Sequence, residues 1–190
     1  MYTTFEKISK EQWIKDIKKY TSIEKEADID ASYEAIQIPT RGSTFSAGYD
    51  FYIPYDFSLG TAKRNVILTG IRWVKHDQYM TEANVGGTSS RITLDIDSLY
   101  QVLLLYARSS VAKECGFSLA NKVGVIDMDY CLAANEGHIM IIVDPKTAIT
   151  DYAFKTGDRI VQGVISPFFT VLNDIVRNDK RTGGFGSTGK

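Results

Sequence analysis

One short segment of the sequence places a cation directly beside two hydroxyl groups. Arg108, Ser109 and Ser110 follow the apolar run VLLLY at 102–106. A guanidinium presents a rigid fork of N–H donors, and hydroxyl and backbone N–H groups offer further donors to an anion. We therefore expect these three residues to bind phosphate oxygens at the end of a strand, although the same triplet also ends strands that bind nothing.

The last ten residues, RTGGFGSTGK at 181–190, form a second segment of this kind. They combine the cation of Arg181 with the hydroxyls of Ser187 and Thr188, and Phe185 offers a ring on which a base can stack. Four glycines favour neither a core strand nor a stable helix here. The segment is either a terminus without a role or a clamp that closes on a nucleotide, and the cation, ring and hydroxyls favour the clamp.

Size and charge limit the classes of function. The chain has 190 residues, enough for one domain with a sizeable core, and its 44% hydrophobic and 24% charged residues are typical of a globular protein. Its 22 basic and 23 acidic side chains give a net charge of −1, so there is no positive surplus to neutralise a nucleic-acid backbone. We expect no nucleic-acid partner.

Membrane insertion, secretion and a cysteine-based metal site are also disfavoured. The longest apolar runs, such as IMIIV at 139–143, are much shorter than the ~20 residues of a membrane-spanning helix, and the first residues lack the apolar stretch of a secretory signal. Cys115, Cys131, His76 and His138 do not have zinc-site spacing. We expect a cytoplasmic protein with no membrane contact and no metal ligands of its own.

The first 35 residues predict a helical N-terminal extension. Ser9 and Gln12 have the spacing of a capping box, and apolar residues then recur at helical intervals, which predicts an amphipathic helix over 9–20. The acidic stretch at 23–35 either extends this helix or forms a second short one. We expect residues 1–35 to serve packing or assembly.

After the extension, short runs rich in Val, Ile, Tyr and Phe alternate with Gly, Pro, Asn and Asp. This pattern is typical of closely spaced strands and predicts an all-β sandwich or jelly roll rather than a doubly wound α/β sheet. A polar segment at about 75–98 contains NVGGTSS and predicts an inserted hairpin or long loop. The predicted strands are 49–53, 64–68, 101–107, 123–126, 138–143 and 159–166.

Five segments, in order along the chain, resemble the motifs of the homotrimeric dUTP diphosphatases. Their number and order make chance a poor explanation. The resemblance covers the chain from about residue 36 to its end and leaves out residues 1–35 and the insertion. The five segments are AGYDF at 47–51, ARSS at 107–110, NKVGVIDMDY at 121–130, GDRIVQ at 157–162 and RTGGFGSTG at 181–189.

The resemblance implies a distorted jelly-roll core over 36–180, a flexible nucleotide-closing tail over 181–190, and a homotrimer whose active sites are shared between chains. It implies that dUTP is hydrolysed between its α- and β-phosphorus atoms to give dUMP and pyrophosphate. Mg²⁺ would arrive on the substrate triphosphate and keep several of its waters.

The third motif carries the residues that the resemblance assigns to the reacting centre and to substrate selection. Asp127 corresponds to the general base that activates the attacking water. Tyr130 corresponds to a tyrosine under the deoxyribose, where its ring excludes a 2′-hydroxyl. Asn121 and the backbone of Val123 and Gly124 correspond to the uracil contacts, where an unpaired buried group would reject other bases.

The resemblance assigns the remaining contacts to the phosphates and to closure. Residues expected to bind the phosphate chain are Arg108, Ser109, Ser110 and Gln162. Residues expected to cover the base and hold the γ-phosphate are Arg181, Phe185, Gly186, Ser187 and Thr188. Lys180 stands where the family's tail arginine is usual, so Lys180 and Arg181 are alternative cations.

Structural roles are expected for the other charged residues of the motifs. Asp50 would organise the site, and Asp129, close to the base, would be structural. Asp158 and Arg159 are neighbours in the sequence, and we expect them to form an ion pair.

Two alternative functions remain at this point. A dCTP deaminase-like enzyme of the same fold shares the Arg-Ser-Ser element, but that branch carries an arginine where this chain has Lys113, and a catalytic glutamate that HIMIIV at 138–143 lacks. A nucleotide-gated regulator would use the N-terminal helix or the insertion to bind a protein partner. Asp127 and an intact tail favour an active hydrolase.

Overall fold

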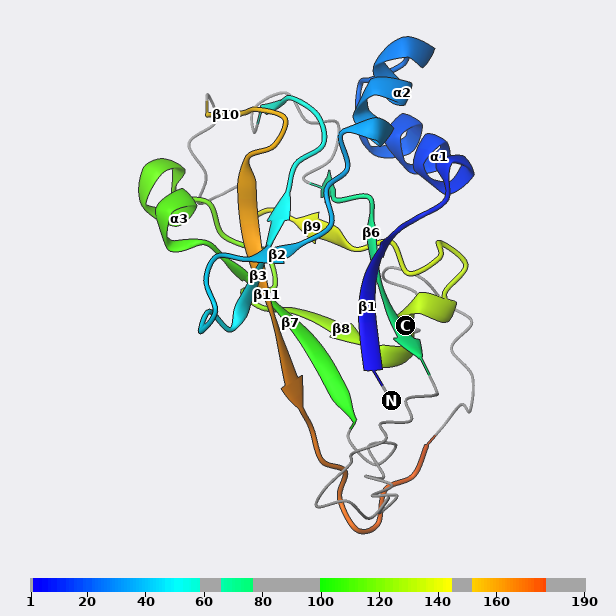
Figure 1. The fold of residues 1–190 in the computed structure, drawn as a ribbon, viewed down its shortest axis with the longest axis vertical. Helices are drawn as coiled ribbons and strands as arrows, with labels where there is room; N and C mark the ends of the chain where they lie inside the picture. Colours follow the sequence, from blue (N-terminus) through cyan, green and yellow to red (C-terminus); the bar gives the residue numbers. More distant parts are fainter. Residues whose placement is uncertain (1, 59–65, 77–99, 145–151, 177–190) are drawn as a thin grey trace, which may run out of the picture.

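The computed structural model describes residues 2–58, 66–76, 100–144 and 152–176. Strands dominate these ranges, as the sequence predicted, and helices are few (Figure 1). The strands are β1 (Tyr2–Lys7), β2 (Thr40–Arg41), β3 (Gly48–Tyr52), β4 (Phe57–Ser58), β5 (Val66–Leu68), β6 (Ile71–His76), β7 (Gln101–Ala107), β8 (Gly124–Asp127), β9 (Met140–Ile142), β10 (Ala153–Phe154) and β11 (Arg159–Pro167). The helices are α1 (Lys10–Tyr20), α2 (Glu26–Glu34), α3 (Ser109–Cys115) and the 3₁₀ helix η2 (Met128–Leu132).

A five-stranded antiparallel sheet in the order β2-β3-β11-β7-β8 carries most of the motif residues. β11 lies at its centre, so that Gln162 pairs with Asp50 on β3 and with Tyr106 on β7. Gly163 permits close packing there, since a Cβ at this position would lie 2.8 Å from the Phe51 ring and 2.9 Å from Leu103 Cδ1. The sheet thereby brings together segments that are far apart in the sequence.

Three two-stranded sheets complete the β structure. β4 pairs with β10, β5 pairs with β9, and β1 pairs with β6 from Tyr2↔His76 to Lys7↔Ile71. The core between them is apolar and aromatic, with Phe51, Leu103, Phe117 and Ile139 exposing at most 1% of their surface. Burial of these side chains is the main stabilising contribution to the fold.

The prediction of a purely helical extension over 1–35 needs correction, because the segment begins with β1 and then packs into the core. β1 lies along β6 in Figure 1, and α1 follows it directly. Trp13 and Ile17 of α1 are fully buried among core side chains. A strand was missed here because the pairing partner of β1 lies about seventy residues away in the sequence, where no local pattern can indicate it.

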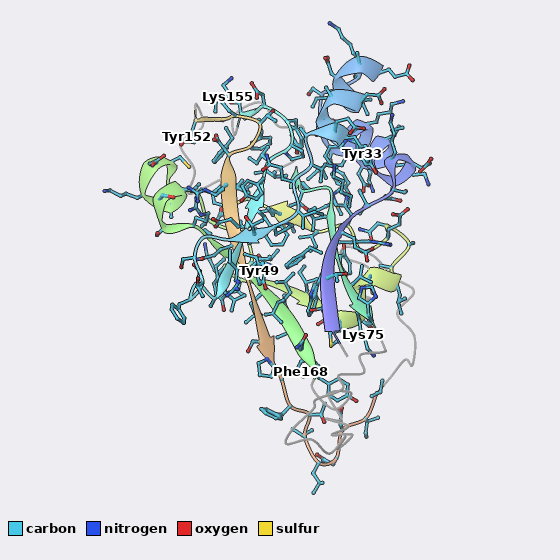
Figure 2. The ribbon with its side chains drawn as sticks, in the orientation of Figure 1. Tyr33, Tyr49, Lys75, Tyr152, Lys155 and Phe168 are labelled. Atoms are coloured by element: carbon cyan, nitrogen blue, oxygen red, sulfur yellow. The ribbon has the colours of Figure 1, made fainter. Side chains whose placement is uncertain are left out.

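The two N-terminal helices agree with the sequence in their main features. Ser9 caps α1 and accepts a hydrogen bond from the backbone N–H of Gln12 at 3.1 Å, as predicted. The acidic stretch forms a separate short helix, α2. Tyr33 of α2 (Figure 2) donates its hydroxyl proton to the Ile8 carbonyl at 3.0 Å and so ties α2 to the segment between β1 and α1.

The predicted strands correspond to β3, β5, β7, β8, β9 and β11, with β9 shorter than expected. Sequence patterns missed β1, β2, β4, β6, β10 and the short helix α3. Residues 59–65, 77–99, 145–151 and 177–190 lie outside the described ranges, and the predicted insertion falls almost entirely within 77–99. No helix in the described part of the chain is long and apolar enough to cross a membrane.

Candidate functional site

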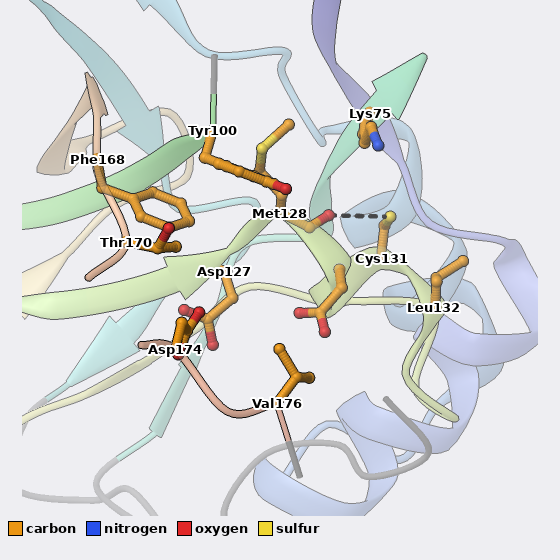
Figure 3. Close-up of a pocket in the computed structure, with 11 residues that line it drawn as sticks. Lys75, Tyr100, Asp127, Met128, Cys131, Leu132, Phe168, Thr170, Asp174 and Val176 are labelled. Carbon is orange, nitrogen blue, oxygen red and sulfur yellow. Dashed lines mark hydrogen bonds between the residues drawn. The ribbon is translucent and has the colours of Figure 1, made fainter. Parts of the chain in front are cut away.

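Asp127 lies at the edge of a pocket of about 590 Å³ (Figure 3). It ends β8 and begins η2, and its side chain is exposed. Asp129 and Asp174 line the same pocket, and the rings of Tyr100 and Phe168, 5.4 Å apart between centroids, form an apolar wall. The pocket therefore offers an accessible carboxylate beside a partly apolar surface.

Tyr130 occupies a different position from its neighbour Asp127. Its side chain is 5% exposed and does not line the pocket. Its hydroxyl donates to the His138 carbonyl at 3.1 Å and accepts from Asn135 Nδ2 at 3.0 Å. The ring is the buried side chain of η2, and its expected place beneath the sugar stays a prediction.

The first, second and fourth motifs meet at Asp50. This side chain is 8% exposed, and its two carboxylate oxygens pair with two arginines: Oδ1 with Arg108 Nε at 2.9 Å and Oδ2 with Arg159 Nη1 at 3.3 Å. Asp50 thus orients Arg108, as its predicted organising role requires.

The predicted ion pair between Asp158 and Arg159 is wrong, since Arg159 pairs with Asp50 instead. Asp158 accepts a hydrogen bond from the backbone N–H of Lys155 at 2.8 Å and closes the turn before β11. Adjacent residues in extended backbone point to opposite faces. Neighbours in the sequence are therefore poor candidates for a contact at the start of a strand.

The Arg-Ser-Ser segment begins a helix that the sequence analysis did not predict. Arg108 is the N-cap of α3, and Ser109 and Ser110 form its exposed first turn. Gly116 ends the helix in the left-handed conformation, with φ of 65°, and this glycine is the signal that could have revealed it. Ser109 and Ser110 are exposed, so that an anion can reach their hydroxyls.

The segment before β8 holds the residues expected at the uracil edge. Asn121 is exposed, and its carbonyl accepts a hydrogen bond from the Val123 N–H at 2.7 Å. Lys122 adopts φ of 63° between them, and its Nζ pairs with Asp144 Oδ2 at 3.2 Å. Gly124 lies so close to β7 that a Cβ would be 3.1 Å from Leu105 Cβ. Asn121 and Lys122 of this tight turn are exposed, whereas Gly124 is buried against β7.

One chain does not bring Asp127 and Arg108 together. Asp127 pairs with Val102 near the start of β7, whereas Arg108 follows Ala107 at its end. Six residues of extended strand span roughly 20 Å at about 3.3 Å each. The candidate base and the candidate phosphate ligand therefore lie at opposite ends of one strand.

Of the other predicted site residues, Gln162 lies within the described ranges and the tail residues lie outside them. Gln162 on β11 is described, and its side chain lies over Gly48, where a Cβ would be 2.7 Å from its Oε1. The tail residues Lys180, Arg181, Phe185, Gly186, Ser187 and Thr188 lie outside these ranges, and their roles stay predictions. The described residues hold no group of three or more His, Cys, Asp or Glu side chains arranged to bind a metal ion.

The sequence analysis missed the pocket wall of Tyr100 and Phe168 and the acidic side chain of Asp174 beside it. It also missed a buried pair, in which His138 Nδ1 lies 2.6 Å from Asp16 Oδ2. The members of this pair are 122 positions apart, so no spacing rule connects them.

Comparison with known proteins shows that the chain is similar to deoxyuridine 5′-triphosphate nucleotidohydrolases. The deoxyuridine 5′-triphosphate nucleotidohydrolase of Lactococcus lactis subsp. lactis is 35% identical over 156 residues, which cover 81% of this chain and 89% of that protein. The protein of the same name from Anaplasma marginale is 28% identical over 165 residues, covering 84% and 93%. No family model matches the sequence.

Solved structures give the same result for the fold. A dUTPase from Streptococcus mutans covers 88% of this chain and 98% of its own, with a TM-score of 0.53 and 26% identity. A mutant dUTPase from phage phi11 of S. aureus, described with a structural Mg(II) ion, covers 77% and 93%, with a TM-score of 0.52 and 20% identity. The second likeness concerns the fold alone.

Proposed function

The chain belongs to the family of deoxyuridine 5′-triphosphate nucleotidohydrolases, and on this basis we propose that it hydrolyses dUTP to dUMP and pyrophosphate. The observation that carries the proposal is the exposed carboxylate of Asp127, which ends β8 at a pocket in a chain with this family's fold. Such a carboxylate can accept a proton from water as the water attacks the α-phosphorus.

Asp127 acts as the general base in this proposal. A base must reach the proton that it removes. Asp127 is exposed at the pocket, where a water molecule can reach its carboxylate. The proton of the attacking water passes to its carboxylate, and the bond between the α-phosphorus and the bridging oxygen to the β-phosphate breaks.

The active site is formed between chains of a homotrimer. The separation of Asp127 from Arg108 along β7 supports this proposal, because residues at both ends of one strand cannot contact one small substrate. A second observation supports it: the segment after β11 exposes large apolar side chains. Phe169 is 87% exposed and Ile175 is 86% exposed, and apolar surface of this kind is normally buried against another chain.

Arg108 and the first turn of α3 bind the phosphate chain, together with Gln162. Asp50 holds Arg108 Nε, which leaves the other guanidinium N–H groups to donate to phosphate oxygens. The tail residues Arg181, Phe185, Gly186, Ser187 and Thr188 then close over the base and γ-phosphate, with Lys180 as the alternative cation. Closure would exclude water other than the nucleophile.

Mg²⁺ enters with the triphosphate in this proposal. The pocket carboxylates Asp127, Asp129 and Asp174 form no metal cage in the described part of the chain, and phosphate oxygens and water are themselves suitable ligands. Asp129 and Asp174 line the pocket beside Asp127, where their carboxylates could contact the waters of an ion carried by the substrate. When bound, the ion would screen the phosphate charge and orient the chain of phosphates.

Selection of base and sugar falls to the third motif. The backbone of Val123 and Gly124, with Asn121, reads the uracil edge, and the Tyr130 ring rejects a 2′-hydroxyl. The exposed, tightly turned segment before β8 supports the first role.

A cytoplasmic location and a protein partner at the insertion are also proposals, and both rest on the sequence alone.

A substrate panel tests the proposed function. Pyrophosphate release is measured from dUTP, dTTP, dCTP and UTP in the presence of magnesium, and ammonia release is measured from dCTP. We expect pyrophosphate from dUTP, far less from the other three, and no ammonia. Appreciable ammonia would identify the deaminase alternative, and a chain that cleaves none of the four would refute the proposal.

A further inference from the structure

Helix α1 and its N-cap contact one short loop, Asn135–His138, at two points. The Glu136 carboxylate accepts two hydrogen bonds from Ser9, one from the backbone N–H at 2.8 Å and one from the hydroxyl at 2.6 Å. About two turns further along the helix, Asp16 Oδ2 lies 2.6 Å from His138 Nδ1. These contacts join residues more than 120 positions apart.

The second contact is buried, and each of its two side chains accepts a further hydrogen bond. His138 is 0% exposed and Asp16 is 5% exposed. The backbone N–H of Gly70 donates to His138 Nε2 at 2.9 Å, so Nε2 is the acceptor and Nδ1–H donates to Asp16. Gln12 Nε2 donates to the same Asp16 oxygen at 2.9 Å. The imidazole therefore has one orientation, set from both sides.

The other face of the loop holds Tyr130. The Tyr130 hydroxyl donates to the His138 carbonyl, and Asn135 Nδ2 donates to that hydroxyl. Gly137 has φ of 71°, and a Cβ there would lie 2.6 Å from Cys131 Cα and 2.8 Å from the Tyr130 carbonyl oxygen. The loop thus packs directly on the backbone of η2, and the position of the Tyr130 ring depends on the position of the loop.

We propose that Ser9, Asp16, Glu136 and His138 are positioning residues that hold Tyr130 through this loop and so set the discrimination between deoxyribo- and ribonucleotides. The inference rests on the proposed function, in which the Tyr130 ring excludes a 2′-hydroxyl. Steric exclusion of one oxygen atom needs a ring that does not move away, because a displaced ring leaves room for the larger sugar. The N-terminal segment thereby contributes to specificity without contacting substrate.

The test is the ratio of kcat/KM for dUTP to kcat/KM for UTP in the full-length protein. Glu136→Ala removes the two carboxylate oxygens that accept hydrogen bonds from Ser9. We expect the ratio to fall roughly tenfold. Glu136→Gln keeps an oxygen acceptor for the Ser9 N–H, and its ratio is expected to stay within about twofold of the wild type. Rescue by the amide would show that the hydrogen bond, rather than the charge, is required.

A matched control separates positioning from stability. Ile17→Val loosens the buried face of α1 without touching the loop, and we expect it to lower the melting temperature but leave the substrate ratio unchanged. If Glu136→Ala does not fold, Ser9→Ala carries the test, since it removes one of the two donors; we expect its ratio to fall in the same direction.

The outcomes distinguish this inference from the proposed function. A wild-type protein that does not cleave dUTP would refute the proposed function. An active Glu136→Ala or Ser9→Ala protein with an unchanged ratio would overturn the positioning role alone. A ratio that falls equally in Ile17→Val would also overturn it, because general loosening would then explain the change.

Discussion

Among single residues, Asp50 joins three of the motifs through its ion pairs with Arg108 and Arg159. It is almost fully buried, and each of its oxygens pairs with a different arginine. Burial of a charge is costly unless partners compensate it, and here Arg108 and Arg159 do so. Asp50 therefore determines the direction in which the Arg108 guanidinium points.

Asp50→Asn is expected to weaken substrate binding more than it slows turnover. The amide keeps one acceptor oxygen but removes the charge that holds Arg108, so we expect KM for dUTP to rise about tenfold, equivalent to about 1.4 kcal/mol, with a smaller change in kcat. Steady-state kinetics measure both. Asp56→Asn is the control, because the Asp56–Lys155 pair is exposed and such pairs contribute little. Equal KM values in the two variants would contradict the role of Asp50.

At the scale of elements, local signals predicted α1 and β7, whereas long-range contacts determined what was missed. The capping serine and helical spacing specify α1 within twelve residues, and β7 is a continuous apolar run. By contrast, β1 becomes a strand through pairing with β6, and α3 begins at Arg108 without a side-chain cap. Residue types alone do not indicate β1, and the local signal for α3 is Gly116 at its C-terminal end.

In the candidate site, too, local sequence patterns predicted individual residues but not their partners. The motifs predicted Asp127 and Asp50, because each stands in a recognisable local pattern. The true partner of Arg159 depends on the pairing of β3 with β11, and the partner of Ser9 depends on a loop 127 positions away. The local sequence shows which charged and polar side chains are present, whereas the pairing of strands and the packing of loops determine which of them form contacts.

The contact between α1 and the Asn135–His138 loop predicts a stability effect of acid. Burial raises the pKa of Glu136, but the two hydrogen bonds from Ser9 and the nearby charges of Arg72 and Lys15 outweigh this effect, so the net pKa lies below 4.5. A carboxylate whose pKa is depressed by folding stabilises the protein above its unfolded pKa, and that contribution is lost as the pH falls through the folded pKa.

We therefore expect the stability advantage of the wild type over Glu136→Gln to be constant near neutral pH and to shrink as the pH falls below about 4.5. Urea unfolding of both proteins between about pH 7 and pH 3.5 measures the difference. Glu11→Gln serves as a control, because Glu11 is an exposed carboxylate in the first turn of α1. A difference that does not vary with pH would show that the Glu136 carboxylate is not held by Ser9 in solution.

At the scale of the whole molecule, the separation of Asp127 from Arg108 has a direct consequence. If each site takes its base from one chain and its phosphate ligands from another, two inactive variants can restore each other. Co-expression of Asp127→Asn with Arg108→Ala should recover about one quarter of wild-type turnover, because random mixing leaves that share of shared sites intact. Turnover no higher than that of either variant alone would indicate that one chain supplies both groups.

The C-terminal segment can be tested at the same scale. Deletion of 181–190 removes the ring, cation and hydroxyls assigned to closure but none of the described core. We expect turnover of dUTP to fall by several orders of magnitude while the sedimentation coefficient still indicates a trimer. Full activity of the shortened chain would refute the closure role.

The proposed hydrolysis requires Asp127 to activate water against the α-phosphorus of dUTP. Pyrophosphate release from dUTP with magnesium, measured side by side for the wild type and Asp127→Asn together with the dUTP affinity of both, tests this role. We predict rapid release by the wild type and a loss of several orders of magnitude in kcat for Asp127→Asn, with binding retained. Near-normal turnover by the variant would contradict this role.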